Sequence, residues 1–159
     1  MFRELVRKRK AIPQDVCIDV LKNETRGVLS VLGDDDYPYG MPMNHFYDEE
    51  TGKIYFHVGS QRSHRNDAIR KHDKVSYCVY DQGYKDEGDW AYNVKSIIVF
   101  GRIAVIEDKD RIIEITSKLT KKFTDDAAYL ENELKTNLAR TLLLEITPEH
   151  ISGKYVKEA

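Results

Sequence analysis

Cysteine is scarce in this chain, whose 159 residues include only Cys17 and Cys78. Two cysteines are too few for a disulfide framework, and both are interpreted as small buried hydrophobic residues of a reducing compartment. An excess of one charge is also missing, because 25 basic and 27 acidic residues leave a formal net charge of -2. This balance argues against nucleic acid as a general electrostatic partner.

Long apolar runs are absent as well. None approaches the ~20 residues that cross a bilayer, and the basic residues 1–12 are not followed by the apolar core of a signal peptide. We therefore expect a cytoplasmic protein that does not bind membranes. With 41% hydrophobic and 33% charged residues, the composition is that of a soluble globular protein, and the length fits one domain over residues 1–159.

The common catalytic motifs are missing too. Without GxGxxG or a Walker loop, a classical dinucleotide or nucleotide fold is not supported, and no GxSxG marks a hydrolytic serine. The five histidines are scattered without HExxH or a CxxC partner, so we expect no metal site. The carboxylates at 34–36 lack the ligand alternation of a calcium loop and are interpreted as a hairpin turn.

Strand patterns dominate what the sequence does contain. Apolar runs and apolar–polar alternation predict strands over 27–33, 37–48, 53–58, 74–80, 96–106 and 141–147, the last of them closed by Pro148. Helices are predicted from Pro13, over 66–72, from Asp108 to Phe123, and over 125–138 with Leu130 and Leu134 inward. Strands this close together favour a mainly β fold with flanking helices, a six-stranded antiparallel barrel. Gly101 indicates a bend or bulge.

Residues 53–74 join a strand to a helix through a short polar loop. Ser63 occupies the position of a helix N-cap, and Arg65 follows within the first turn. Free backbone N–H groups and the positive end of a helix attract anions, and an arginine adds a planar pair of donors. The segment predicts a phosphate site; a solvated loop with ordinary helix capping is the alternative.

Residues 37–48 contain Pro38 and Pro42, which cannot both lie in a fully paired central strand. We expect an edge or bulged strand whose free backbone groups meet a planar ligand rich in heteroatoms, with Asn44 and His45 beside it. The alternative is an edge that proline protects against aggregation. In the polar segment 81–92, Trp90 and Tyr92 are expected to close over a ligand or a partner subunit.

Together and in this order, these segments resemble the FMN-binding split-barrel proteins of the pyridoxamine 5'-phosphate oxidase-like group, and most closely their nitroimidazole-resistance branch. The resemblance covers nearly the whole chain and rests on GVLSVL with YPYGMPMNHFYD, on KIYFHVGSQRSHRNDAIRKHDKVSYCV, on VKSIIVFGRIAVIED and on ISGK. It implies a six-stranded split barrel that forms a homodimer with two FMN sites shared between the protomers.

The resemblance also implies the residues that contact FMN. The strand along the flavin ring supplies Met41, Pro42, Met43, Asn44 and His45; the phosphate end supplies His57, Val58, Ser63, His64 and Arg65; Ser96 lies near the flavin. His57 matches the active-site histidine of the nitroimidazole-resistance branch and is the catalytic candidate. Arg65 stands where the family has lysine, and Val94 replaces its usual aromatic residue.

The activity implied by the resemblance is that of an oxidoreductase. NADH, NADPH or another donor reduces bound FMN, and electrons pass to a small acceptor such as a nitroimidazole. The alternatives are a flavin store, sensor or carrier without turnover, a split barrel that uses haem or a deazaflavin, and a dimeric structural module. Oxidation of pyridoxamine phosphate itself is not expected, because the ending ISGKYVKEA lacks the Arg-rich substrate segment of that enzyme.

Overall fold

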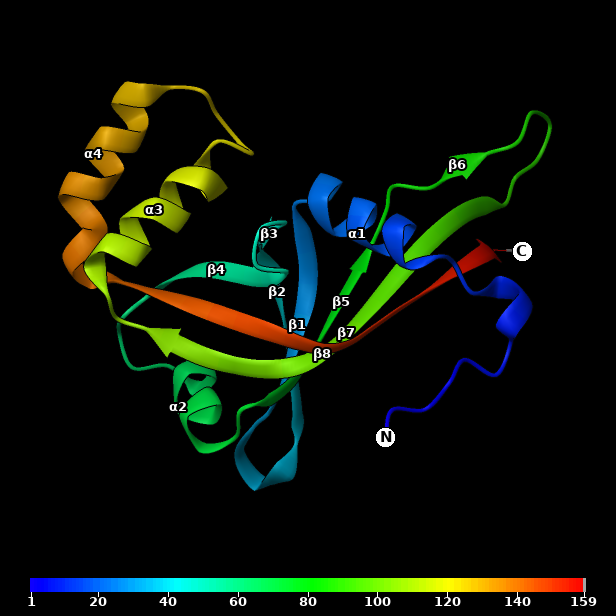
Figure 1. Cartoon of the computed structure of the whole chain (residues 1–159), viewed down its shortest axis with the longest axis horizontal. Coiled ribbons are helices and arrows are strands. Elements are labelled where there is room, and N and C mark those ends of the chain that lie inside the picture. Colours follow the sequence, from blue (N-terminus) through cyan, green and yellow to red (C-terminus); the bar gives the residue numbers. More distant parts are fainter. Residues whose placement is uncertain (159) are drawn as a thin grey trace.

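A curled antiparallel sheet forms the body of this computed structural model, which describes residues 1–158 (Figure 1). The strand order is β2-β1-β5-β7-β8-β4-β3, and β6 pairs with β7 outside this path. The strands are β1 (Arg26–Leu32), β2 (Pro38–Asn44), β3 (Phe46–Asp48), β4 (Lys53–Gly59), β5 (Lys74–Tyr80), β6 (Tyr84–Lys85), β7 (Tyr92–Ile106) and β8 (Thr141–Glu158). Because β3 and β6 have only three and two residues, six long strands remain, and the predicted split-barrel fold is confirmed.

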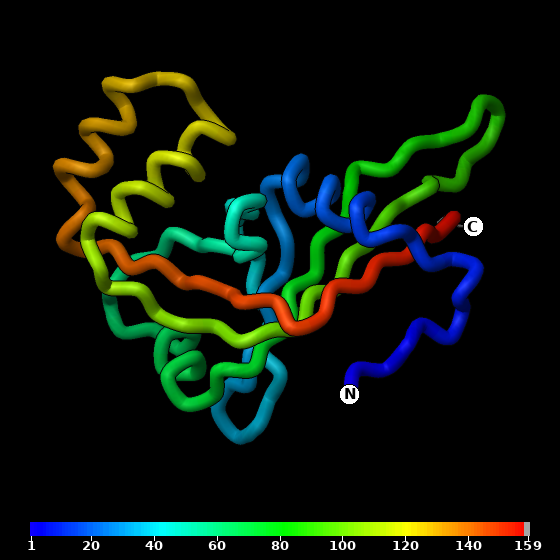
Figure 2. Tube along the Cα trace, in the orientation of Figure 1, coloured from blue at the N-terminus to red at the C-terminus, as the bar shows by residue number. Residues whose placement is uncertain are grey.

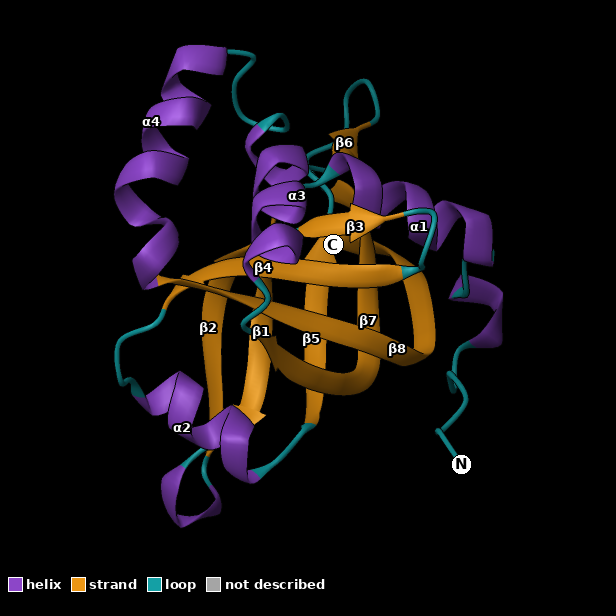
Figure 3. Cartoon of the chain, turned by 60° about the vertical axis from the view of Figure 1, so that its left-hand side comes forward, coloured by secondary structure: helices purple, strands orange, loops and turns teal. Residues whose placement is uncertain are grey.

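Helices flank this sheet, as Figure 3 shows. They are α1 (Gln14–Asn23), α2 (His64–Lys71), α3 (Lys109–Thr120) and α4 (Ala127–Asn137), with short 3-10 turns at Lys8–Lys10, Asp34–Asp36 and Leu138–Arg140. Side-chain oxygens of Ser63, Asp108 and Asp126 accept from backbone N–H groups at the starts of α2, α3 and α4. Such caps satisfy donors that have no partner within the helix. None of the helices in the described residues is long and apolar enough to cross a membrane.

The main core fills the inside of the curl, because alternate residues of each strand point to one face. On β5, Val75, Tyr77 and Val79 are buried, while the residues between them are more exposed. In β4, however, side chains on both faces of the strand are buried. Ile54 and Phe56 enter the main core, whereas Tyr55 packs with residues of α3 on the outer face. That outer packing holds α3 against the sheet.

The last strand corrects one prediction, because β8 does not end at Pro148 but continues to Glu158. The register between β7 and β8 shifts at Phe100/Gly101, and Gly101 pairs with Pro148 at this irregularity. Proline lacks a backbone N–H and is tolerated at such a bulge. A Cβ on Gly101 would lie 2.5 Å from the Thr147 carbonyl oxygen, so the close approach there requires glycine.

Two predictions about the helical pair were also wrong. The helix α3 ends at Thr120, and Phe123, expected on its inner face, lies beyond it and is 46% exposed. The helix α4 has no buried residue, so Leu130 and Leu134 are only partly covered. Figure 2 shows the reason for this exposure of α4, which lies outside α3 and away from the sheet. Both chain termini lie on the opposite side of the molecule.

Candidate functional site

An opening lies where the two ends of the curled sheet approach each other, between β2 and β4. A pocket of about 590 Å³ fills it and is called the split pocket here. Its lining comes from β1, β2, β4, α2 and α3: Arg26, Pro42, Met43, Asn44, His57, Val58, Gly59, Arg65 and Leu119. Because β2 is the terminal strand of the path, one side of its backbone has no strand partner, as expected for a strand with two prolines.

Two guanidinium groups face this pocket, and no carboxylate of the described residues lines it. Arg65 is half-buried; its Nε donates to Asn66 Oδ1 at 3.1 Å, and its Nη1 lies 3.9 Å from Met43 Sδ. Arg26 donates from Nε to Asn44 Oδ1 at 3.0 Å. Burial lowers the pKa of Arg65 from its ordinary value, because little in its surroundings compensates the positive charge. An anion placed between these side chains would supply that compensation.

The loop between β4 and α2 is held in place by Asn66, which is completely buried. Its Nδ2 donates to the carbonyl oxygens of Gly59 at 3.2 Å and Gln61 at 3.0 Å. Ser63 Oγ accepts from Asn66 N at 3.2 Å as the N-cap of α2. The cap of α2 is evident from the sequence, but the burial of Asn66 is not, because its position in a polar helix gives no sign of it.

His57 lies on the outer face of β4, half-buried at the edge of the split pocket. The Thr141 hydroxyl donates to the Asn137 carbonyl at 2.9 Å, so its oxygen accepts from His57 Nε2–H at 3.2 Å. This arrangement leaves Nδ1 of a neutral ring as a proton acceptor. Burial lowers the pKa of His57, while the nearby Glu133 carboxylate opposes that shift.

His45 has a different environment from the neighbouring Asn44. Its side chain is completely buried; Nε2–H donates to the Leu21 carbonyl at 2.7 Å, and Nδ1 accepts from the Tyr77 hydroxyl at 2.8 Å. Burial, followed by the charge of Lys122, lowers the pKa of His45 to about 4. The imidazole is therefore neutral at pH 7 and belongs to the core beneath β2.

The remaining predicted residues are divided by the fold. The split pocket brings together Pro42, Met43, Asn44, His57, Val58 and Arg65. Outside its lining lie Met41, His45, Ser63, His64 and Ser96. His64 stacks on Tyr39 with ring centroids 4.3 Å apart, and its Nε2 accepts from Asp34 N at 3.2 Å. Ser96 lies on β7 between Tyr80 of β5 and Lys154 of β8. The roles of all these residues toward FMN stay predictions.

Arg26 and Leu119 line the split pocket but were missed by the sequence analysis. Arg26 opens β1 and Leu119 ends the buried stripe of α3, so each has an ordinary structural interpretation. Only the closing of the sheet brings them near Arg65, which is remote from both in the sequence. No group of three or more metal-ligating side chains occurs among the described residues.

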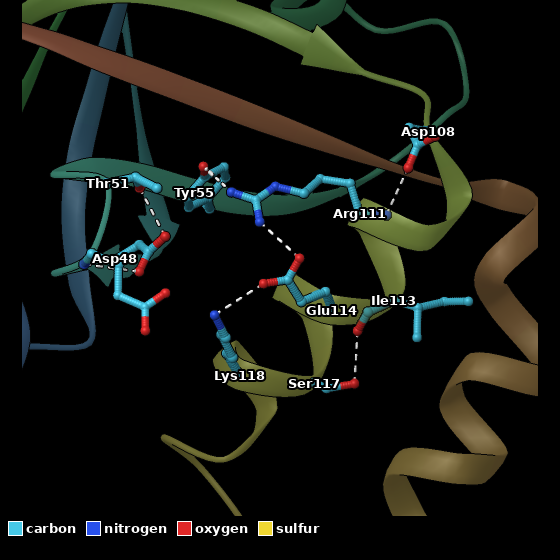
Figure 4. Close-up of polar contacts among 10 residues, drawn as sticks. Asp48, Thr51, Tyr55, Asp108, Arg111, Ile113, Glu114, Ser117 and Lys118 are labelled. Atoms are coloured by element: carbon cyan, nitrogen blue, oxygen red, sulfur yellow. Dashed lines mark hydrogen bonds and ion pairs between the residues drawn. The ribbon is translucent and has the colours of Figure 1, made fainter.

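The position of α3 beside the pocket is fixed by a polar network, which Figure 4 shows in close-up. Arg111 Nη2 donates to the Tyr55 hydroxyl at 2.6 Å, and Nη1 donates to Glu114 Oε2 at 2.8 Å. Lys118 adds a bond to the same carboxylate at 3.0 Å. Because Tyr55 belongs to β4, this network joins α3 to the strand that carries His57.

A sequence profile described as pyridoxamine 5'-phosphate oxidase matches residues 13–155. The chain belongs to the pyridoxamine 5'-phosphate oxidase family. No curated protein matches it.

Solved structures show the same fold for this family member. A candidate 5-nitroimidazole antibiotic resistance protein from Bacteroides thetaiotaomicron has a TM-score of 0.75 at 13% identity, with 93% of this chain and 87% of that chain covered. An FAD-binding protein from Mesorhizobium loti has a TM-score of 0.67 at 21% identity, covering 92% and 97%. An FAD- and haem-binding protein from Mycobacterium smegmatis has a TM-score of 0.71 at 19% identity, covering 94% and 74%.

Proposed function

We propose that this member of the pyridoxamine 5'-phosphate oxidase family is a cytoplasmic, homodimeric flavoprotein that binds FMN in the split pocket. The observation that carries the proposal is the pair of guanidinium groups, Arg26 and Arg65, in a pocket without carboxylates. A phosphate matches the planar donors of arginine, and its charge compensates the half-buried Arg65. The free edge of β2 offers backbone N–H and C=O groups to a flat heteroaromatic ring.

The residues of the chain have distinct parts in this proposal. Arg65 and the start of α2 hold the phosphate, and Asn66 keeps the loop before α2 in position. Bound FMN would supply the electron transfer itself, while the protein supplies orientation and electrostatics. His57, whose Nε2 is fixed by Thr141, presents Nδ1 to orient an acceptor or move a proton.

The family resemblance and the structural neighbours support a flavin ligand. Two of the neighbours described above are FAD-binding proteins, and a third is the candidate resistance protein. The proposed reaction is therefore reduction of a small acceptor, such as a 5-nitroimidazole, with electrons from NADH or NADPH. Exposed aromatic side chains on β5, β6, β7 and the loop before β7 support a homodimer, because a second protomer would cover them: Tyr80, Tyr84, Trp90 and Tyr92.

Anaerobic half-reactions test the activity. The FMN-loaded protein is mixed with NADH or NADPH while the flavin absorbance is followed, and a 5-nitroimidazole is then added. We expect bleaching by the reductant and recovery with the nitro compound, with reduction products identified by mass spectrometry. Tight FMN binding without reduction by either nucleotide, or without transfer to any nitro acceptor, would contradict the reductase and leave a flavin store or sensor.

A further inference from the structure

A second pocket, called the helical chamber here, adjoins the split pocket and has a volume of about 480 Å³. Asn44, His57 and Leu119 line both pockets, so the two spaces meet at these side chains. The other walls come from α3, α4 and the loop between them: Thr116, Thr120, Phe123, Thr124, Asp126, Tyr129 and Glu133. A molecule in the helical chamber therefore sits next to the proposed flavin site.

The two pockets have opposite charge. The split pocket is lined by two arginines and no carboxylate, whereas the helical chamber is lined by two carboxylates and no lysine or arginine. In the described part of the chain, neither Asp126 nor Glu133 forms an ion pair. Asp126 Oδ1 accepts from Tyr129 N as the cap of α4, which leaves its second oxygen available. Glu133 is close enough for its charge to act on the pKa of His57.

A polar side chain without a partner lies in the wall of the chamber. Thr116 is 3% exposed, and its Oγ1 forms no hydrogen bond within the described residues. A buried hydroxyl without a partner costs free energy, so such groups in native proteins call for a ligand or a water. Thr116 belongs to the chamber lining, on the helix turn before Thr120, so an uncompensated hydroxyl lies directly behind this wall.

Aromatic side chains form the outer part of the chamber. Phe123 is 46% exposed and Tyr129 is 54% exposed, although both belong to the chamber lining. Aromatic rings placed at a cavity mouth stack on planar ligands and attract cations over their faces.

From these observations we infer that the helical chamber is the acceptor site and that, among small acceptors, it prefers an aromatic or heteroaromatic ring with a protonated amine on a side chain. The rings of Phe123 and Tyr129 contact the ligand ring, and Glu133 with Asp126 binds the ammonium group. The acceptor role rests on the proposed function, whereas the ligand class follows from the chamber itself. The chamber is not the site of the NADH or NADPH that reduces the flavin, because the pyrophosphate of a dinucleotide would face two carboxylates there.

Redox-inert probes test the ligand class without any need for turnover. Binding of 2-phenylethylamine and of 2-phenylethanol, which differ in the charged group, is measured calorimetrically at low salt with the protein in the presence and in the absence of excess FMN. We expect the amine to bind roughly tenfold more tightly than the alcohol, as a charge-assisted hydrogen bond provides. The preference should shrink at high salt, since the carboxylates are partly exposed.

Matched variants test whether the chamber carboxylates cause the preference for the amine. Glu133→Gln combined with Asp126→Asn should make the two affinities about equal, and asparagine preserves the cap of α4. The control is Glu131→Gln, which removes a carboxylate of the same helix that pairs with Lys135 and does not line the chamber. Glu131→Gln should keep the preference.

Equal affinities for amine and alcohol in the unaltered protein would overturn the inference, as would a preference that survives the double substitution. A separate FMN titration distinguishes this failure from failure of the proposed function. FMN binding without an amine preference removes the helical chamber as a cation site. An amine preference without FMN binding removes the acceptor role and retains the ligand class.

Discussion

The phosphate contact of Arg65 gives a prediction that combines affinity with stability. The Arg65→Ala substitution removes a half-buried guanidinium whose hydrogen bonds to described side chains reach only an amide oxygen and a thioether. A hydrogen bond between an arginine and a phosphate contributes about 1.5–3 kcal/mol, so the FMN dissociation constant should rise roughly tenfold to a hundredfold. The apoprotein should lose no stability, because the pKa of Arg65 is lowered by burial and its charge is poorly compensated.

Riboflavin has the flavin ring of FMN but no phosphate, so its affinity distinguishes the contribution of the phosphate to binding from that of the ring. Quenching of flavin fluorescence reports both affinities, and urea unfolding of the apoprotein reports stability. Arg65→Ala should weaken FMN binding far more than riboflavin binding. Arg70→Ala is the matched control, since Arg70 is exposed on the same helix and lies outside the split pocket. Unchanged FMN affinity, or an equal loss for FMN and riboflavin, would refute the assignment.

Three further predictions concern His45, His57 and Asp108. Burial lowers the pKa of His45 to about 4. As the pH falls below about 6.5, His45 is protonated in the unfolded chain but stays neutral in the native state, so the free energy of unfolding decreases from about pH 6.5 to about pH 4. The loss of stability is about 2 kcal/mol at about pH 5. Urea unfolding should show this loss in the unaltered protein and not in His45→Gln, and the same pH dependence in both proteins would contradict the prediction. His57→Gln, once loaded with FMN, should reduce the acceptor about a hundredfold more slowly in stopped-flow experiments, whereas an unchanged rate would remove His57 from catalysis. Asp108→Ala deletes the 2.8 Å cap bond to Arg111 N of α3 and should cost about 1 kcal/mol in urea unfolding, while Asp108→Asn should cost little; equal losses would contradict the capping role.

Local signals explain which parts of the fold the sequence predicted. The strand β4, the Ser63 cap and the start of α2 follow from neighbouring residues, and the structure has all three. The course of β8 past Pro148 could not be predicted in this way, because it depends on the register shift opposite Gly101. The exposure of α4 likewise depends on where α3 ends and on how little sheet remains beside it.

The candidate site was less predictable, because its geometry comes from contacts between distant segments. His45 and Asn44 are adjacent polar residues, yet only Asn44 lines the split pocket, since His45 is drawn into the core by Leu21 and Tyr77. Arg26 gave no sequence signal at all. The helical chamber depends on α3 and α4 folding over His57, which no local pattern indicates.

The central claim is that the split pocket binds FMN, and a visible absorption spectrum tests it most directly. The purified protein is examined before and after titration with FMN, and its absorbance is followed through gel filtration. We predict flavin bands that co-elute with a dimer of this chain. A Soret band would redirect the assignment to haem, and a colourless protein that binds no FMN even when titrated would contradict the account.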